Sequence, residues 1–141
     1  MKTIDQKIAA LGLKLPEPSA PVANYVPFVT SGNLVFISGQ ISKVGDEAIG
    51  GRLGEDLTVE RGQAAARLSA LNLLAQMKAA CNGDLSRVKR VVKLGGFVQA
   101  LPTATAADIP KVINGCSDIM VAVLAMPGGM QDLPSPPPHC H

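Results

Sequence analysis

A long apolar stripe that begins after Thr58 leaves this chain few possible folds. Thr58 can cap the amino end of a helix, and Asn82 with Gly83 supply a stop at the far end. A helix with one apolar face needs a second layer to cover it, so the rest of the chain must supply packing partners. Apolar side chains recur at the spacing of one helix face at Ala64, Leu68, Leu71 and Ala75, widened by Leu74, Met77 and Cys81.

Two further helices are predicted. Thr3 and Gln6 can form a capping box, and apolar residues then recur at helical spacing as far as Gly12. A second long amphipathic helix begins near Asp108 and Pro110. Its apolar positions are Ile109, Val112, Ile113, Cys116, Ile119, Met120 and Val123.

Strands are predicted between these helices. From Tyr25 to Ser38, β-branched and aromatic residues flank a turn at Gly32, which indicates an antiparallel hairpin. Leu34 to Ile37 is apolar on both faces and predicts a buried strand. The glycine-rich segment 45–54 predicts a loop or a weak edge strand, and residues 88–98 predict a strand interrupted at Gly95 and Gly96.

This order of elements predicts one α/β (α+β) domain, a mixed sheet packed by two long helices. The 141 residues are enough for one compact domain. We divide the chain into a domain over 1–124, with its helix at 1–12 and an extended arm at 13–24, and an atypical proline-rich tail over 125–141. A helix laid on a sheet normally returns the chain to that sheet. Five of the eleven prolines fall between Pro127 and Pro138, however, so the final strand is expected to be missing.

Net charge and cysteine content limit the possible location of the protein but identify no binding partner. The formal charge of +2 gives no reason to expect nucleic acid, and no stretch predicts a membrane span or an export signal. A cytoplasmic location follows by default. Cys81 and Cys116 lie on predicted apolar helix faces, where a free cysteine acts as a small hydrophobe. No metal site and no cofactor are predicted.

Several residues carry a resemblance to a known family. Pro21 to Tyr25 leads into the hairpin, Ser38, Gly39 and Gln40 end its second strand, and Asn114 lies inside the last helix. In these features the chain resembles the YjgF family of reactive-intermediate deaminases, in particular a subgroup with an added N-terminal helix. The similarity runs from the start of the chain to about Leu124.

The resemblance implies a chorismate mutase-like fold and a homotrimer with ligand clefts between its subunits. In this family the cleft binds small 2-imino or 2-amino-acrylate acids and speeds their hydrolysis to 2-keto acids and ammonia. The positions that match its lining are Tyr25, Ser38, Gly39 and Asn114. The implied partner is therefore a small carboxylate-bearing ligand.

The family's catalytic arginine has no counterpart here. That arginine stands on the last long strand, in an Arg-Ser-x-Val context, and its guanidinium grips the substrate carboxylate with two hydrogen bonds. This chain has no arginine after Arg90. The catalytic residues are therefore unknown, and the chain lacks the arginine on which the predicted deaminase activity depends.

The coding frame offers a hypothesis for this loss. In the alternative frame made from the third base of one codon and the first two of the next, Met126 with Pro127 forces Ala, and Met130 with Gln131 forces a second Ala. The junctions that follow Met126–Pro127 include this second Ala, and with suitable silent bases they read Gly-Arg-His-Ala-Arg-Ser-Ala-Val, close to how the family continues. We hypothesise a one-nucleotide slip near Leu124. Sequencing the coding DNA tests this hypothesis. Third bases that do not encode these alternative-frame residues would refute it.

Each candidate residue also has a plain structural interpretation. Tyr25 can simply pack beside a strand, Ser38 and Gly39 can simply end it, and a buried Asn114 would need hydrogen-bond partners whatever its function. Three functions therefore stay open: an imine or enamine hydrolase, a non-catalytic small-molecule-binding trimer, and an endoribonuclease or translation inhibitor, as the family has also been described. No constellation for RNA cleavage is visible.

Overall fold

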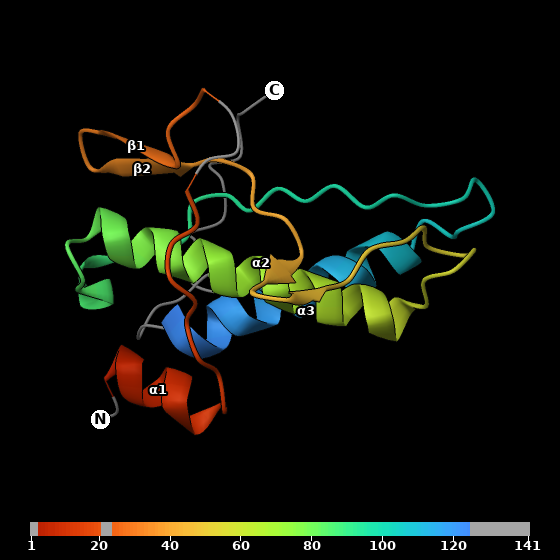
Figure 1. The fold of residues 1–141 in the computed structure, drawn as a ribbon, viewed down its shortest axis with the longest axis horizontal. Coiled ribbons are helices and arrows are strands. Elements are labelled where there is room, and N and C mark those ends of the chain that lie inside the picture. Colours follow the sequence, from red (N-terminus) through yellow and green to blue (C-terminus); the bar gives the residue numbers. More distant parts are fainter. Residues whose placement is uncertain (1–2, 21–23, 125–141) are drawn as a thin grey trace, which may run out of the picture.

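The computed structural model describes residues 3–20 and 24–124. Figure 1 shows a layer of strands and extended chain on one side of two long helices, with a short helix on the other side. The elements, in chain order, are α1 (Ile4–Ala10), β1 (Phe28–Ser31), β2 (Leu34–Ile37), β3 (Lys43–Val44), β4 (Glu47–Ala48), α2 (Val59–Ala80), the 3-10 turn η1 (Leu85–Arg87) and α3 (Asp108–Leu124).

The helix ends follow the capping residues of the sequence. At α1, the Gln6 amide donates to Thr3 Oγ1 at 3.2 Å and the Thr3 amide donates to Gln6 Oε1 at 2.9 Å, which completes the predicted capping box. Thr58 caps α2 by accepting from the Arg61 amide. Asn82 and Gly83 end α2 with φ of 54° and 91°, the left-handed backbone that glycine and asparagine tolerate best. All three predicted helices are confirmed.

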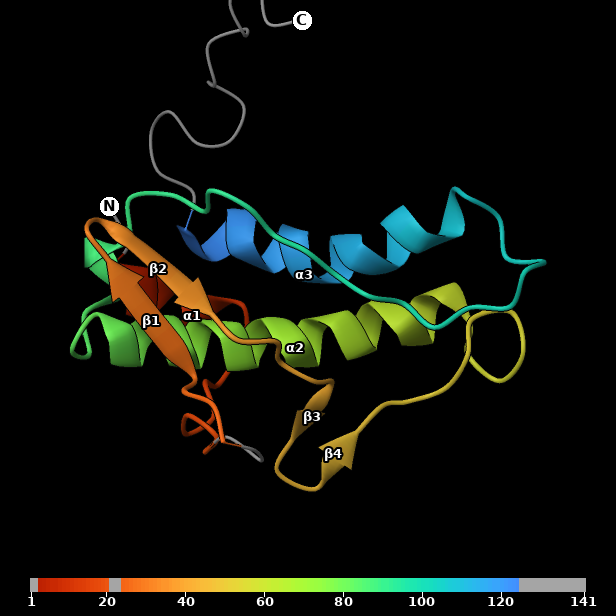
Figure 2. The same cartoon turned by 90° about the horizontal axis from the view of Figure 1, so that it is seen from above.

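Glycine brings the two long helices close together. A Cβ on Gly115 of α3 would lie 2.3 Å from the carbonyl oxygen of Gln63 on α2. On α2 the equivalent position is Gly62, where a Cβ would lie 2.7 Å from a methyl group of Val112. The two helix backbones can lie this close together only because neither glycine has a side chain. The crossing in Figure 2, where α2 and α3 run side by side, is therefore set by these two residues.

The core lies between α2 and α3 and extends to α1. Leu74 of α2 and Val123 of α3 are fully buried, and Ile8 joins the same cluster from α1. Other members are Ala70, Leu85, Cys116, Ile119, Met120 and Leu124. Burying apolar side chains contributes about 25 cal/mol for each Å² removed from water, so this cluster is the main source of stability within one chain.

The strand layer consists of two small antiparallel sheets. In the first, β1 pairs with β2 from Phe28 opposite Ile37 to Ser31 opposite Leu34, which confirms the predicted hairpin. In the second, β3 and β4 pair over two residues each, in agreement with the weak strand predicted near this glycine-rich segment. Both sheets contact α2. The fold class is confirmed, although the described residues form two separate hairpins instead of one mixed sheet.

The strand predicted over residues 88–98 is wrong. This segment runs extended past the helices in Figure 2 but forms no strand ladder with the described residues, and only Ala100 bridges to Leu53. Val88, Val91 and Leu94 pack on the core, three residues apart. A strand turns every second residue to the same face, so this spacing of three departs from strand geometry. The final family strand would fall within 125–141, outside the described residues.

The prediction that β2 is buried is also wrong for this single chain. Leu34, Val35 and Phe36 expose 47%, 41% and 60% of their surface. An apolar strand becomes buried only when both of its faces are covered. Successive residues of a strand point to opposite faces, so the exposure of all three residues means that the described residues leave both faces of this part of β2 partly uncovered.

Burial of Cys116 predicts a dependence of stability on pH. Burial raises the pKa of the Cys116 thiol from 9.0 to about 11. Between these values the unfolded chain has lost the thiol proton and the folded chain keeps it, so the contribution of Cys116 is fully present below pH 9 and is lost as the pH rises toward 11. We expect the stability advantage of the wild type over Cys116→Ala, measured by urea unfolding, to shrink over this window. An advantage that stays constant would contradict the argument.

Candidate functional site

Ser38 and the segment beside Tyr25 are brought together by hydrogen bonds. The Ser38 hydroxyl donates to the carbonyl oxygen of Val26 at 2.7 Å, and the Ser38 amide donates to the carbonyl oxygen of Pro27 at 2.9 Å. The chain that enters the hairpin is thus fixed against the chain that leaves it. Tyr25, the neighbour of Val26, stays 46% exposed, so its ring is available to a ligand or to a second subunit.

Gly39 and Gln40 shape the end of β2. Gly39 is exposed, and a Cβ added there would meet nothing within 4 Å. The Gln40 side-chain amide donates to the carbonyl oxygen of Ser38 at 3.0 Å. The main chain around Ser38 is therefore held rigidly, and the open side of Gly39 leaves room for another group to approach the backbone.

Asn114 lies on a different element, the exposed side of α3. Its Oδ1 accepts a hydrogen bond from the Ser117 hydroxyl at 3.4 Å. The hydrogen bonds of Ser38 go to Val26 and Pro27 instead, so these bonds do not join Asn114 to the hairpin. Because Asn114 is exposed, water can satisfy its polar atoms. The structural interpretation of Asn114 assumed a buried side chain, so it does not apply here.

Two side-chain amides on α2 anchor chain segments near the site. Neither was singled out from the sequence. Asn72 and Gln76 are buried at 6% and 1% exposure. Asn72 Nδ2 donates to the carbonyl oxygens of Ile41 and Lys43 at 3.1 and 2.7 Å, and so ties the chain after β2 to the helix. Asn72 and Gln76 lie one helical turn apart beside the apolar stripe of α2, and this position was the one sign in the sequence that they face the interior.

Large apolar side chains are exposed on the first hairpin, on the chain that flanks it and on the extended segment 88–98. Phe36 and Ile41 are 60% and 70% exposed, and on the extended segment Val92 and Phe97 are 72% and 105% exposed. Val26 and Val29 add to this surface from the entry to the hairpin. We call these six residues the outer apolar face. Exposed apolar residues that gather in one patch mark interaction sites, and we expect these six to take part in one.

Positive charge lies near the outer apolar face. Arg87, Lys89, Arg90 and Lys93 are all exposed. Among the described residues, their side chains have no carboxylate within ion-pair distance. No group of three or more His, Cys, Asp or Glu side chains in 3–20 and 24–124 is placed to hold a metal ion. No helix in the same ranges is long and apolar enough to cross a membrane.

Three helices beneath a layer of small antiparallel sheets define an α+β protein of the chorismate mutase-like class. Residues 5–133 match the family model described as "YjgF/chorismate mutase-like, putative endoribonuclease", and the chain belongs to this family. The family prediction is therefore confirmed, and the match runs past Leu124 into the proline-rich tail.

Known proteins agree with this assignment. The chain is 50% identical to "Protein TCP17" of Trypanosoma cruzi over 115 residues, which is 80% of this chain and 69% of that protein. It is similar to the crystal structure of "a putative endoribonuclease" from Shewanella oneidensis MR-1, with 36% identity, a TM-score of 0.82, and coverage of 88% of this chain and 81% of that one. It is also similar to the protein Atu1372 "with unknown function" from Agrobacterium tumefaciens, with 44% identity, a TM-score of 0.79, and coverage of 94% and 85%.

Proposed function

We propose that this protein binds small 2-imino, 2-amino-acrylate or 2-keto acids in clefts between the subunits of a homotrimer. The observation that carries the proposal is the arrangement around Ser38. Its hydrogen bonds to Val26 and Pro27 fix one wall of a site, with Tyr25 half-exposed beside it. Asn114 lies on the exposed side of α3, a different element, and a second copy of the chain would supply the opposite wall of the proposed cleft.

The outer apolar face supports assembly of several chains. Phe97 and Ile41 are among the most exposed apolar side chains of the described residues. Large apolar patches on a soluble protein mark interfaces. Burying such side chains against a second copy contributes about 1.5 to 3 kcal/mol for each one fully covered. We expect the purified protein to sediment at three times the chain mass of 14.6 kDa.

Catalysis is expected to be weak even where binding occurs. A carboxylate ligand needs a cation in the cleft to bind it. The family's arginine, which has this role, has no counterpart here, since the chain has no arginine after Arg90. A guanidinium fork holds a carboxylate with two charge-assisted hydrogen bonds, and no neutral side chain replaces that geometry. The proposal is accordingly a small-molecule-binding trimer derived from imine hydrolases.

Hydrolysis of 2-iminopropionate tests this directly. We expect the chain as written to release ammonia at least about 100-fold more slowly than a version whose tail carries the alternative-frame Arg-Ser-Ala-Val, since removing one preorganised charge-stabilising donor has effects of this size. Both versions are assayed at equal concentration of trimer. Their binding of 2-ketobutyrate is measured by calorimetry. Equal rates would contradict the assignment of the missing arginine as the limiting group. Absence of a trimer and of 2-keto acid binding would refute the proposed function itself.

An endoribonuclease is the second candidate, because the family description and one similar structure carry that name. The exposed cations Arg87, Lys89, Arg90 and Lys93 could contact phosphates. RNA cleavage also needs a general base, and the only two histidines are His139 and His141, outside the described residues. Incubation with a labelled RNA over a salt series tests it. Cleavage that weakens with rising salt would favour the nuclease over the small-molecule binder.

A further inference from the structure

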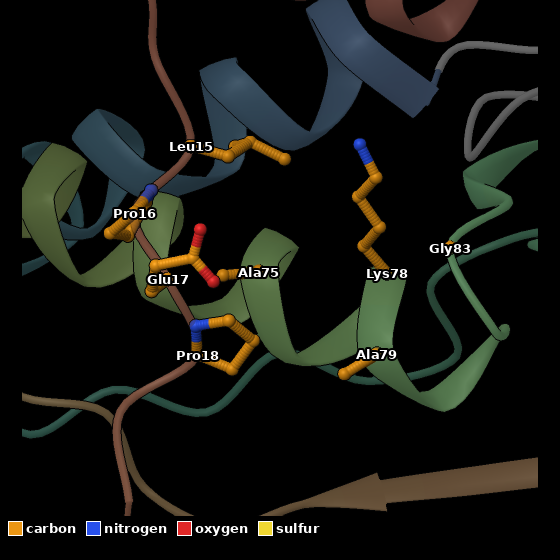
Figure 3. A pocket seen from close by; sticks show the side chains of 8 residues that line it. All are labelled: Leu15, Pro16, Glu17, Pro18, Ala75, Lys78, Ala79 and Gly83. Carbon is orange, nitrogen blue, oxygen red and sulfur yellow. The ribbon is translucent and has the colours of Figure 1, made fainter.

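The N-terminal arm and α2 form the walls of an open pocket that the proposed cleft does not use. Figure 3 shows the arm passing over the carboxyl-terminal half of α2, with the pocket between them. Its volume is about 270 Å³, large enough for a small metabolite. The lining residues are Leu15, Pro16, Glu17 and Pro18 from the arm, Ala75, Lys78 and Ala79 from α2, and Gly83 beyond it.

This pocket is preformed by contacts on either side of it. The Gln76 side-chain amide of α2 donates to the carbonyl oxygen of Ser19 at 3.1 Å, which ties down the arm beyond the pocket. Leu15 packs against the core cluster and ties down the arm before it. Ala79 of α2 is exposed and forms an open floor of the pocket, whereas Ala75, one helical turn before it, is already 3% exposed beneath the surrounding chain.

Opposite charges line the two walls. Figure 3 shows Glu17 on the arm and Lys78 on α2, with their charged ends directed to the same side of the helix but apart from each other. Among the described residues, the ion pair of Lys78 is with Asp5, at 3.6 Å, and Glu17 is not within ion-pair distance of Lys78. The Lys78 and Asp5 side chains are 41% and 73% exposed, so their pair contributes little and is readily shared.

We propose that this pocket binds a free α-amino acid with an aliphatic side chain. A lysine ammonium has three donors, so Lys78 can hold the ligand carboxylate and still contact Asp5. Glu17 accepts from the ligand ammonium, and the aliphatic side chain lies on Ala79 beside Leu15. A ligand with a single charge would bond to only one of the two walls. The inference goes beyond the proposed cleft function and does not depend on it.

Titration of the ¹⁵N-labelled full chain with leucine tests the site. We expect saturable shifts of the Ala75, Ala79 and Gly83 amides, with a Kd in the millimolar range typical of so small a ligand. Lys78→Met and Glu17→Gln are each expected to weaken binding at least about tenfold, because each removes a charge-assisted hydrogen bond. Both positions are on the surface, and an unchanged spectrum of the free variants confirms that the fold is intact.

Matched controls separate the pocket from general charge effects. Lys14→Met removes a cation from the same arm outside the pocket, and Glu47→Gln removes a distant carboxylate on β4; neither is expected to change binding. Two half-ligands test the pairing, namely 4-methylpentanoate, which lacks the amine, and 3-methylbutylamine, which lacks the carboxylate. Each is expected to bind at least about tenfold more weakly than leucine. Leucine shifts that do not saturate or lie elsewhere, half-ligands that bind equally well, or controls that weaken binding as much as the pocket variants would overturn the proposal.

Discussion

Gly115→Ala is expected to lower the free energy of unfolding by about 3 kcal/mol, at the upper end of the range for overpacked cores. The added Cβ would lie 2.3 Å from the Gln63 carbonyl oxygen and 2.8 Å from its Cα. Both are backbone atoms of α2, so no side-chain rotation relieves the contact and the two helices must move apart. The better helix propensity of alanine offsets only about 1 kcal/mol. Urea unfolding followed by circular dichroism measures the change.

A glycine in open space provides the control for this prediction. At Gly50 an added Cβ meets nothing within 4 Å, and no positive φ favours glycine there. We expect Gly50→Ala to change the free energy of unfolding by less than about 0.5 kcal/mol. Protein concentration must be held constant between variants, because assembly contributes to apparent stability. Equal midpoints for the two variants would show that the α2–α3 contact is not as close as the structure has it.

Asn72→Asp is expected to destabilise the protein by about 3 to 5 kcal/mol near neutral pH, the size found when a buried charge is left unpaired. The substitution keeps the shape of the side chain but removes both donated hydrogen bonds. A carboxylate at this position would face the carbonyl oxygens of Ile41 and Lys43, which now lie 3.1 and 2.7 Å from Nδ2. We also expect the segment after β2 to detach from α2, with faster amide exchange around Ile41.

The pH dependence of this variant identifies the cause. Burial and the facing oxygens disfavour the charged form, so the folded-state pKa of the new carboxyl group is raised above its unfolded value. Stability relative to wild type should therefore recover as the pH falls through the folded-state pKa and be lost again as it rises. Asn33→Asp, in the exposed turn of the first hairpin, is the matched control and should show neither effect. A pH-independent loss in Asn72→Asp would point to packing instead of charge.

The candidate site was only partly predictable. The Ser38–Gly39 end of β2 is visible in the sequence, but that Ser38 bonds to Val26 beside Tyr25 depends on how the hairpin closes. The buried amide Asn72 was missed because a polar residue within a helix usually faces solvent. Its two partners, Ile41 and Lys43, lie about 30 residues away in the chain, and such contacts do not follow from local pattern.

The sequence by itself determined the helices. Their signals are local: Thr3 and Thr58 cap helices through hydrogen bonds to amides three residues on, and Asn82 and Gly83 end α2 through their own backbone preference. The β1–β2 hairpin was equally local, since its strands meet across the Gly32 turn.

Tertiary structure alone decided whether residues 88–98 form a strand and how far the first hairpin is buried. Residues 88–98 have the apolar, β-branched composition of a strand, but a strand requires a partner at hydrogen-bond distance, and the described residues pair only with Ala100, just beyond this segment. The exposure of Phe36 has the same origin, because an apolar face is buried only when another surface covers it. Helical hydrogen bonds close within one segment of chain, whereas sheet pairing and burial are properties of segments that only the folded molecule brings together.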